Sequence, residues 1–371
     1  MKIAYVYDAV YPWETGGIQK RVWELASRLS DDHDVHWYGL HYWDGPVIDK
    51  REGVTLHGVA DPSELYIDGR RSITEALSFG GHLVRPLLRE EFDVIDCQSF
   101  PYFSCFSSKL GSIAAEATLF VTWHEIWMEY WHEYLGIKGT VGKAIERIVA
   151  RLPDEHVTVS ARTRRDLGKL GASDSHLVPN GIRMDTVRST PTAPGQIDVL
   201  FVGRLIKEKN ADLLVRAVAA MREGVPTIHC HIIGGGPERA RLEQLVSALG
   251  LEDHVTILGF RETHEEILGL MKAADVFVLP SRREGFGITV LEALACGTPV
   301  VTIDHPQNAS VELVNDGKTG YVTDATPEAV AEATLSARSG VAPSACVAAA
   351  EEYEWDVIAR QIESVYERAT L

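Results

Sequence analysis

The sequence predicts an α/β protein built from two doubly wound units, and three observations support this fold class. Short β-branched and aromatic runs alternate with helix-period segments from end to end, a pattern typical of parallel sheets covered by helices. The chain has 371 residues, more than one hydrophobic core usually supports. Residues 184–198 are rich in Thr, Pro and Gly, lack an apolar period, and divide the chain into two halves.

The predicted strands of the first half are short apolar runs at residues 2–9, 34–40, 55–59, 93–98, 118–124, 156–160 and 175–181. Those of the second half are at residues 198–205, 228–236, 255–260, 276–281, 299–304 and 320–324. Predicted helices lie between them, among them residues 18–30, 210–224, 237–250 and 288–297.

These elements predict a first domain over residues 1–183 and a second over residues 184–352. The last segment, residues 353–371, has an apolar stripe at helical spacing with charges opposite, so we expect a helix there. Docking of this helix on either domain stays open, and packing back on the first domain is our expectation.

The composition excludes several classes of protein. Hydrophobic residues make up 45% and charged residues 24%, and no window approaches 18 uninterrupted apolar residues, so we expect no membrane span. The start of the sequence lacks the pattern of a secretory signal, which predicts a cytoplasmic protein. Five scattered cysteines without a CxxC are typical of reduced core thiols. The net charge of -17 argues against nucleic acid as a partner.

The segment EGFGITVLE, residues 284–292, carries the first candidate site. Gly285 and Gly287 let the backbone approach a ligand closely, and a helix starting near Ile288 presents free N–H groups suited to phosphate. Glu284 and Glu292 would then accept hydroxyl hydrogen bonds from a sugar and a ribose at the two ends of a phosphate-linked ligand. The ordinary alternative is a pair of solvated glutamates, one favoured by the helix dipole.

The sequence resembles the retaining glycosyltransferases of glycosyltransferase family 4. EGFGITVLEALACGTPVV is similar to the family signature, with Glu284 and Glu292 filling its E-x7-E pattern. Five further segments occur in the family's order: GGIQKRVWELASRL, TWHEIW, LVPNGI, FVGRLIKEKN and IIGGGPERARLE. Six such elements cover nearly the whole chain, which makes the resemblance specific.

The resemblance implies a GT-B fold, in which two Rossmann-like doubly wound domains face each other across a cleft. It implies an N-terminal domain that binds the acceptor and a C-terminal domain that binds the donor. The expected activity is that of a hexosyltransferase, which transfers a sugar from a nucleoside diphosphate sugar to an acceptor hydroxyl with retention of configuration. No metal and no cofactor beyond this co-substrate are expected. A sugar-nucleotide epimerase and a non-catalytic sugar-nucleotide-binding subunit stay open as alternatives.

The resemblance also assigns roles to single residues. Arg204 and Lys209, in the loop after a predicted strand, would neutralise the diphosphate, although residues 207–209 also fit a solvated turn. His124 would contact the donor sugar, although a buried structural histidine is the ordinary alternative. The expected catalytic residues are therefore Glu284, His124, Arg204 and Lys209. The expected donor-binding residues are Gly16, Gly17, Gly235, Gly285, Phe286, Gly287, Ile288 and Glu292.

Three further motifs have competing interpretations. GGGP, residues 234–237, fails the dinucleotide frame because Arg239 holds the third glycine position, so we expect a loop near the nucleotide base. DDHD, residues 31–34, contains a D-x-D but fits a solvated turn better than a metal motif. Aromatic residues four apart in WHEIWMEYWHEYLG are more typical of a helix packed into the core than of an acceptor platform.

The partners expected from the resemblance are a nucleotide sugar and a carbohydrate, lipid-linked or small-molecule acceptor. A lipid acceptor would require a basic or apolar face on the first domain, for which residues 143–152 are a weak candidate. Peripheral association with the inner face of a membrane stays open on this reasoning. The sequence does not identify the donor sugar, the base or the acceptor.

Overall fold

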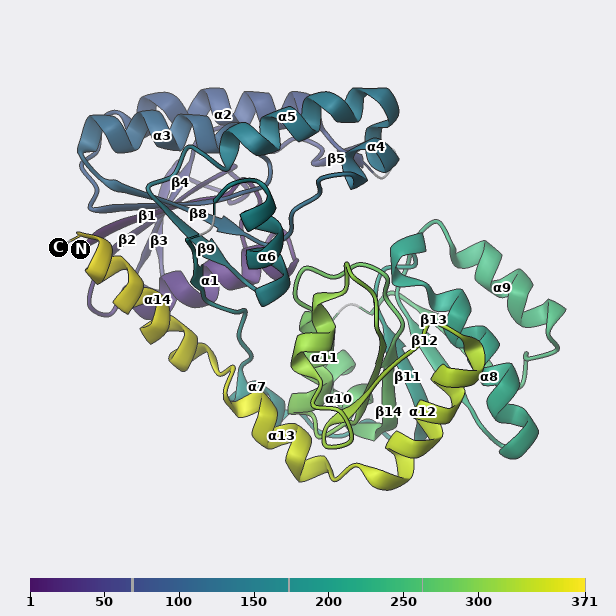
Figure 1. Ribbon diagram of the computed structural model, residues 1–371. Helices are drawn as coiled ribbons and strands as arrows, with labels where there is room; N and C mark the ends of the chain where they lie inside the picture. Colours follow the sequence, from purple (N-terminus) through teal and green to yellow (C-terminus); the bar gives the residue numbers. More distant parts are fainter. Residues whose placement is uncertain (68–69, 173, 262, 371) are drawn as a thin grey trace. The chain divides into compact units, whose positions relative to one another are not determined.

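The computed structural model describes residues 1–67, 70–172, 174–261 and 263–370. The described chain divides into two units: the first comprises Met1–Asn180 and Trp355–Leu371, and the second Gly181–Glu354. Each unit has its own parallel-dominated sheet covered by helices (Figure 1), which confirms the predicted fold class.

The first unit contains an eight-stranded sheet in the order β10-β9-β8-β7-β1-β2-β4-β3. Its strands are β1 Lys2–Val6, β2 Asp34–Gly39, β3 Ile48–Arg51, β4 Val54–Gly58, β7 Val94–Gln98, β8 Thr118–Trp123, β9 Glu155–Thr158 and β10 His176–Leu177. All neighbouring pairs are parallel except β3 with β4. A separate two-stranded hairpin joins β5 Tyr66–Ile67 to β6 Arg70–Arg71.

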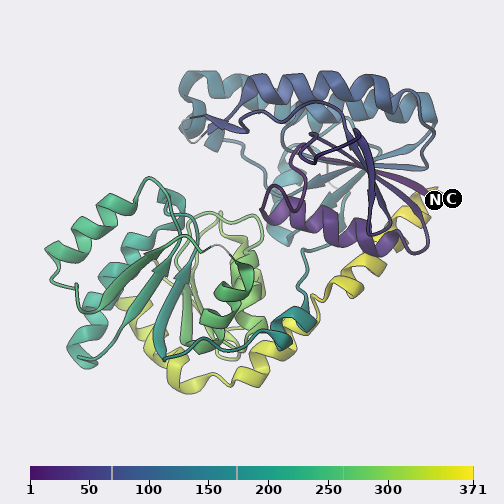
Figure 2. The ribbon, with the colours of Figure 1, turned by 180° about the vertical axis from the view of Figure 1, so that it is seen from behind.

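The helices of the first unit lie on both faces of its sheet. They are α1 Gly17–Leu29, α2 Ile73–Leu87, α3 Phe103–Ala115, α4 Tyr130–Leu135, α5 Gly139–Val149, α6 Ala161–Lys169 and α14 Trp355–Thr370. Figure 1 shows α2, α3 and α5 over one face, and Figure 2 shows α14 beside α1 on the other. The apolar stripe of α14 is buried against this unit, at Trp355, Ile358, Ile362, Val365 and Tyr366.

The second unit contains a six-stranded parallel sheet in the order β13-β12-β11-β14-β15-β16. Its strands are β11 Ile197–Val202, β12 Cys230–Ile233, β13 Val255–Gly259, β14 Ala274–Leu279, β15 Val300–Ile303 and β16 Gly320–Thr323. Its helices are α7 Met184–Ser189, α8 Ala211–Gly224, α9 Arg239–Ala248, α10 His264–Ala273, α11 Ile288–Ala295, α12 Pro327–Gly340 and α13 Pro343–Glu351. Counted along this unit, the strand order is that of a Rossmann fold.

The strands and helices predicted from apolar runs are all present, although β10 shrinks to two residues. The sequence reasoning missed β3, whose residues IDKR are mostly exposed and carry no apolar pattern. It also treated residues 184–198 as a linker, but Met184–Ser189 forms α7. Met184 and Val187 are buried there, which gives this short stretch a core contact that its composition did not indicate.

Candidate functional site

The candidate site of the second unit lies where its strand order reverses. Strands β11 and β14 are neighbours in the sheet, and the chain leaves them in opposite directions, to β12 and to β15. In doubly wound sheets, the carboxyl ends of the two strands at such a reversal diverge and leave room for a ligand. The loop after β11 carries Arg204 and Lys209, and the loop after β14 carries Glu284. A backbone hydrogen bond of 2.8 Å from Arg282 to Glu208 joins the two loops.

Glu284 is held in a fixed position by its backbone and its side chain. Its N–H donates to the carbonyl of Gln307 at 2.9 Å, and its carbonyl accepts from the N–H of Ala309 at 3.0 Å. The carboxylate forms an ion pair with the ammonium of Lys209. The side chains are 10% and 17% exposed, so solvent screens this pair only in part. The structure thus brings together two predicted site residues from different loops.

Arg204 lies close in sequence to Lys209 but in a different environment. Its side chain is exposed, and within the described part of the chain its guanidinium forms no ion pair. Lys209 ends a 3-10 turn, Lys207–Lys209, just before α8. The solvated-turn interpretation holds for Lys207, which is exposed, but not for Lys209. Of the two predicted site residues in this loop, Lys209 is therefore ion-paired and Arg204 is exposed to solvent.

The segment before α11 is shaped by Gly287. This residue caps the helix with φ +96, and a Cβ there would lie 2.5 Å from Cβ of Ser310. Ile288, the first residue of the helix, is half-buried, as is Gly285. Phe286 was predicted to bind the donor, but its ring is only 7% exposed and packs edge-on against Tyr353. Phe286 can therefore offer a ligand little beyond its backbone.

Glu292 departs from the sequence expectation. We expected it to face a ligand, whereas it is 5% exposed and its carboxylate lies 2.7 Å from Nε2 of His264. His264 is the first residue of α10, after the capping residue Thr263, whose hydroxyl accepts from the N–H of Glu266. Sequence reasoning missed His264. The T-x-x-E capping pattern could have located this helix start but not the pairing with Glu292.

The glycines of residues 234–237 fit a loop that packs tightly on its neighbour. Gly234 and Gly236 have φ of +139 and +152, and a Cβ would meet the carbonyl oxygens of Gly203 at 1.9 Å and Leu205 at 2.4 Å. Gly235 instead has open space beside it, while its carbonyl accepts from the N–H of Leu205 at 2.8 Å. Gly235 is thus the glycine of this loop with room for a ligand.

In the first unit, Gly16 and Gly17 open helix α1. Both are exposed, and a Cβ on Gly17 would meet nothing within 4 Å. A Cβ on Gly16 would approach only the flexible side chain of Gln19, at 2.7 Å. Their backbone is therefore accessible at the start of the helix.

His124 follows β8 in the first unit. Its Nε2 lies 2.7 Å from Oε1 of Gln98, the last residue of the adjacent strand β7. Burial, aided by the positive charge of Arg21, lowers the pKa of His124 to about 3, so the imidazole is neutral at pH 7. A neutral ring has one donor and one acceptor nitrogen and carries no positive charge.

The aromatic segment after β8 differs from the single helix that its spacing suggested. Trp123 ends β8, Trp127 lies in the following loop, and only Tyr130–Leu135 is helical. Trp123 and Trp131 are 0% and 6% exposed, so the core interpretation holds for both. The spacing of four residues arose from a strand end, a loop and a short helix that all contribute to one core.

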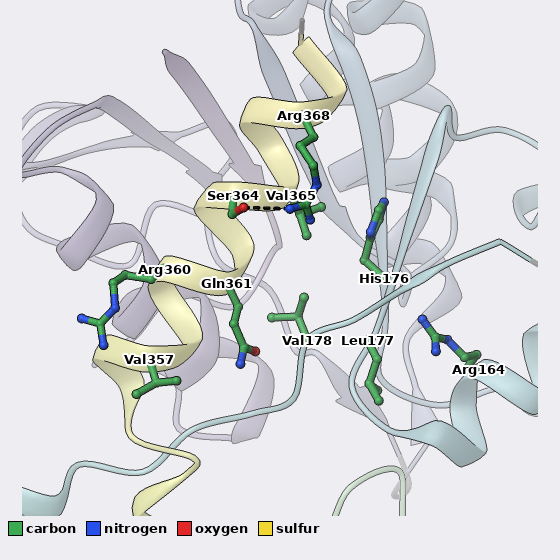
Figure 3. A pocket seen from close by; sticks show the side chains of 10 residues that line it. All are labelled: Arg164, His176, Leu177, Val178, Val357, Arg360, Gln361, Ser364, Val365 and Arg368. Carbon is green, nitrogen blue, oxygen red and sulfur yellow. Dashed lines mark hydrogen bonds between the residues drawn. The ribbon is translucent and has the colours of Figure 1, made fainter.

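The first unit also has an open groove with a volume of about 570 Å³ (Figure 3). It lies between the edge strand β10 and α14, with Arg164 of α6 at one side. Its lining residues are Arg164, His176, Leu177, Val178, Val357, Arg360, Gln361, Ser364, Val365 and Arg368. None of the predicted site residues lines it.

Residues 1–67, 70–172, 174–261 and 263–370 contain no cluster of three or more His, Cys, Asp or Glu side chains arranged to hold a metal ion. None of their helices combines the length and apolar character needed to cross a bilayer.

Comparison with protein families gives two matches that together span both units. The description "Glycosyltransferase Family 4" applies to residues 15–186, and "Glycosyl transferases group 1" to residues 184–340. A GDP-mannose-dependent alpha-(1-6)-phosphatidylinositol monomannoside mannosyltransferase of Mycobacterium tuberculosis is 30% identical over 95% of this chain and 94% of its own length. The chain belongs to glycosyltransferase family 4.

Other family 4 relatives are similar over a shorter region. A GDP-mannose-dependent alpha-(1-6)-phosphatidylinositol dimannoside mannosyltransferase of M. tuberculosis is 33% identical over 48% of this chain and 48% of its own length. The chain thus spans about half the length of this curated relative in the match. Among solved structures, sucrose-phosphate synthase from Thermosynechococcus elongatus has a TM-score of 0.80 at 19% identity, covering 99% and 98% of the two chains. This likeness shows the GT-B fold, as the sequence predicted.

Proposed function

We propose that the protein is a retaining hexosyltransferase, which transfers a sugar from a nucleoside diphosphate sugar to an acceptor hydroxyl. The observation that carries this proposal is the grouping of Arg204, Lys209 and Glu284 on two adjoining loops at the strand-order reversal of the second unit. The two cations would bind the diphosphate of a nucleoside diphosphate sugar, and the carboxylate would bind its sugar. Family 4 membership supports the same reaction class.

Arg204 and Lys209 would stabilise the diphosphate as it leaves. The exposed guanidinium of Arg204 presents a planar fork to phosphate oxygens, and the ammonium of Lys209 acts as a point charge. Fixed cations stabilise the charge that develops on a leaving group because they need no reorganisation during the reaction. Two cations can do this without a divalent metal, so we propose metal-independent transfer.

Glu284 would position the sugar. Two hydrogen bonds fix its main chain and Lys209 holds its carboxylate, which can accept a hydrogen bond from a sugar hydroxyl. In the proposed step, the acceptor oxygen bonds to the anomeric carbon on the face from which the diphosphate departs. The carbon–phosphate oxygen bond breaks, and a phosphate oxygen takes the proton of the acceptor hydroxyl. Configuration is retained because both events use the same face.

Glu292 would recognise the ribose of the donor through its pairing with His264. Glu292 is 5% exposed, whereas the side chain of His264 is 34% exposed, so Glu292 would act by orienting the His264 ring, which it contacts at 2.7 Å, toward a ribose hydroxyl. His124 of the first unit would contact the donor sugar, and the backbone of Gly235, Gly285 and Gly287 would line the donor.

Calorimetric titration with GDP and UDP tests the diphosphate assignment. Arg204→Gln should weaken binding of the preferred nucleotide about ten- to a hundredfold, since a hydrogen bond to a charged group contributes about 1.5 to 3 kcal/mol. Arg216→Gln is the matched control, because Arg216 is an exposed arginine on α8 of the same unit. Unchanged affinity in Arg204→Gln would reject the assignment.

GDP-mannose is the first donor to assay, because the M. tuberculosis relatives are named as dependent on it, with UDP-glucose as the contrast. The anomeric configuration of the product, read by NMR, tests retention. Isomerisation of the donor without an acceptor would instead identify an epimerase.

We further propose that the acceptor is presented at an anionic lipid surface, which α5 and the turn before it contact. The large apolar side chains Ile137, Val141 and Ile148 are 93%, 62% and 49% exposed. Val149 of α5 faces the core, as in an ordinary amphipathic helix, so these exposed side chains form a second apolar face. An apolar stripe open to solvent beside cations fits the boundary between lipid headgroups and acyl chains.

The charges around this stripe favour an anionic surface. Lys138, Arg147 and Arg151 are exposed there. Glu146 is fully buried, and its carboxylate accepts from the Tyr102 hydroxyl at 2.7 Å and from the N–H groups of Trp127 and Met128 at 2.8 and 2.9 Å. The acid within this helix therefore offsets none of the exposed cations, although the chain as a whole carries -17.

Co-sedimentation with vesicles tests this surface. The protein should bind vesicles of phosphatidylglycerol and phosphatidylcholine, and not phosphatidylcholine alone. Arg147→Gln with Arg151→Gln should weaken binding about tenfold or more, at about 1 kcal/mol per basic residue near an anionic surface. Arg216→Gln again serves as the control. Equal binding by the double variant would remove α5 from the contact.

A further inference from the structure

A buried chain of hydrogen bonds leads from the C-terminal helix to His124. The hydroxyl of Tyr366 on α14 donates to Oδ2 of Asp96 at 2.5 Å. The amide nitrogen of Gln98 donates to Oδ1 of Asp96 at 3.1 Å, and Oε1 of Gln98 lies 2.7 Å from Nε2 of His124. Tyr366, Asp96 and Gln98 are 0%, 2% and 1% exposed. Water therefore has little access to these bonds.

Asp96 is surrounded by donors. Besides Tyr366 and Gln98, the hydroxyl of Thr122 donates to it at 2.8 Å. Arg21 of α1 is 2% exposed and adds a favourable positive charge. Burial raises the pKa of Asp96 on balance, although these hydrogen bonds and Arg21 act in the opposite direction. The geometry nevertheless favours the ionised carboxylate, because Tyr366, Thr122 and Gln98 all donate to its two oxygens and a carboxylate only accepts hydrogen bonds.

The ionised carboxylate fixes the amide of Gln98. A carboxylate accepts only, so the NH2 group of Gln98 must face Asp96 and its carbonyl oxygen must face His124. A carbonyl oxygen also only accepts, so Nε2 of His124 must carry a hydrogen. Because the ring is neutral, Nδ1 is then the atom with the lone pair. The orientation of an amide and the tautomer of a histidine thus follow from one buried charge.

We propose that Asp96, Gln98 and Tyr366 are positioning residues, which hold His124 as the Nε2–H tautomer with Nδ1 ready to accept a hydrogen bond from a hydroxyl of the donor sugar. The contact with the sugar rests on the proposed function, whereas the tautomer does not. The last helix of the chain becomes part of the donor-binding machinery through a bond between residues 270 positions apart. Outer partners of this kind commonly fix the tautomer and ring orientation of functional histidines.

Nitrogen-15 NMR of histidine-labelled protein tests the tautomer directly and without a ligand. In the unchanged protein, His124 should show a protonated Nε2 whose hydrogen exchanges slowly with water. Gln98→Met keeps the volume but removes the acceptor, so this hydrogen should exchange rapidly and the Nδ1–H form should appear. A protonated Nδ1 in the unchanged protein, or unaltered His124 signals in Gln98→Met, would overturn the proposal.

Ser107→Ala is the matched control for a general loss of structure. Ser107 is a buried residue of α3, and its hydroxyl donates to the carbonyl of Gly80 at 2.5 Å. Losing this bond should reduce stability in the same unit and leave the His124 signals unchanged. A change of the His124 signals in Ser107→Ala equal to that in Gln98→Met would show that they report stability alone, and would overturn the proposal.

Tyr366→Phe tests whether the C-terminal helix α14 contributes to the positioning of His124. Without the tyrosine hydroxyl, Asp96 should take up a proton at higher pH. Protonated Asp96 can donate to Oε1 of Gln98 and release the amide from its fixed orientation. The Nε2–H signal should therefore be lost at higher pH than in the unchanged protein. An identical pH dependence would exclude α14 from the positioning chain. The charged or titratable groups facing Asp96 in this experiment are Tyr5, Arg21 and Tyr366.

Binding separates this inference from the proposed function. The contribution of the mannose to binding is measured as the ratio of the Kd for GDP to the Kd for GDP-mannose. Gln98→Met should reduce this ratio about two- to tenfold, as expected for the loss of one neutral hydrogen bond. If the tautomer changes and this ratio does not, the positioning of His124 stands and its contact with the sugar is wrong. If the tautomer does not change, the positioning itself is wrong.

Discussion

Glu284→Gln should slow transfer without weakening nucleotide binding. The carboxylate pairs with Lys209 at side-chain exposures of 10% and 17%, where charge–charge energies are larger than at the surface. Glutamine has nearly the same size and can still accept a hydrogen bond, so the two loops should keep their conformation. The variant removes the negative charge that competes with a diphosphate for Lys209. Affinity for the free nucleoside diphosphate should therefore be unchanged or higher.

The loss of rate follows from the proposed contact with the sugar. A hydrogen bond from a hydroxyl to a carboxylate contributes about 1.5 to 3 kcal/mol, and the neutral one that glutamine can still accept contributes about 0.5 to 1.5 kcal/mol, so the loss of about 1 to 1.5 kcal/mol corresponds to about five- to tenfold in kcat. The assay is steady-state transfer from the preferred donor, paired with calorimetric binding of its nucleoside diphosphate. Glu243→Gln is the control, since this exposed glutamate pairs with Arg239 on α9. Wild-type turnover in Glu284→Gln, or weaker nucleotide binding at unchanged kcat, would refute this reasoning.

Three further predictions concern the helix cap, pH and metals. Gly287→Ala should destabilise the protein by about 1 kcal/mol or more, because φ of +96 is strained for alanine and its Cβ would meet Ser310 at 2.5 Å. Denaturant unfolding measures this, and an unchanged midpoint would contradict it. Burial lowers the pKa of His57 and His156 to about 4, from 6.5 in the unfolded chain. The unfolded state then binds more protons between pH 6.5 and 4, so these residues should reduce stability as pH falls through that window. His57→Gln should flatten the profile there, and an identical slope would argue against the buried neutral ring. Transfer should continue in EDTA, whereas activity lost in EDTA and restored by Mg²⁺ or Mn²⁺ would reject metal independence.

Local sequence determined much of this fold. Apolar alternation and helical periodicity act over a few residues, so every strand of the two large sheets except β3 could be predicted one by one. Family 4 membership, predicted from six ordered motifs, is confirmed by the match over 95% of the chain. Strand β3 could not be predicted, because its residues are mostly exposed and only pairing with β4 orders them.

The candidate site was predictable in its residues but not in its pairings. The motifs located Glu284, Lys209 and Arg204, yet only the sheet order showed that their loops adjoin at a reversal of strand direction. Glu292 was expected to face a ligand, whereas its carboxylate is buried beside His264. No local pattern links these two residues, since they are brought together by the packing of α10 against α11.

The sequence alone therefore determined the order of elements, the family and the loops that carry charged side chains. Only the tertiary structure decided which of those charges are neutralised, which acids are buried and which tautomer a histidine adopts. Glu146 and Asp96 illustrate the difference, because each is an ordinary acid in the sequence and a fully bonded buried group in the fold. The physical reason is that ionisation and hydrogen bonding depend on solvent exclusion, which is produced by residues far apart along the chain.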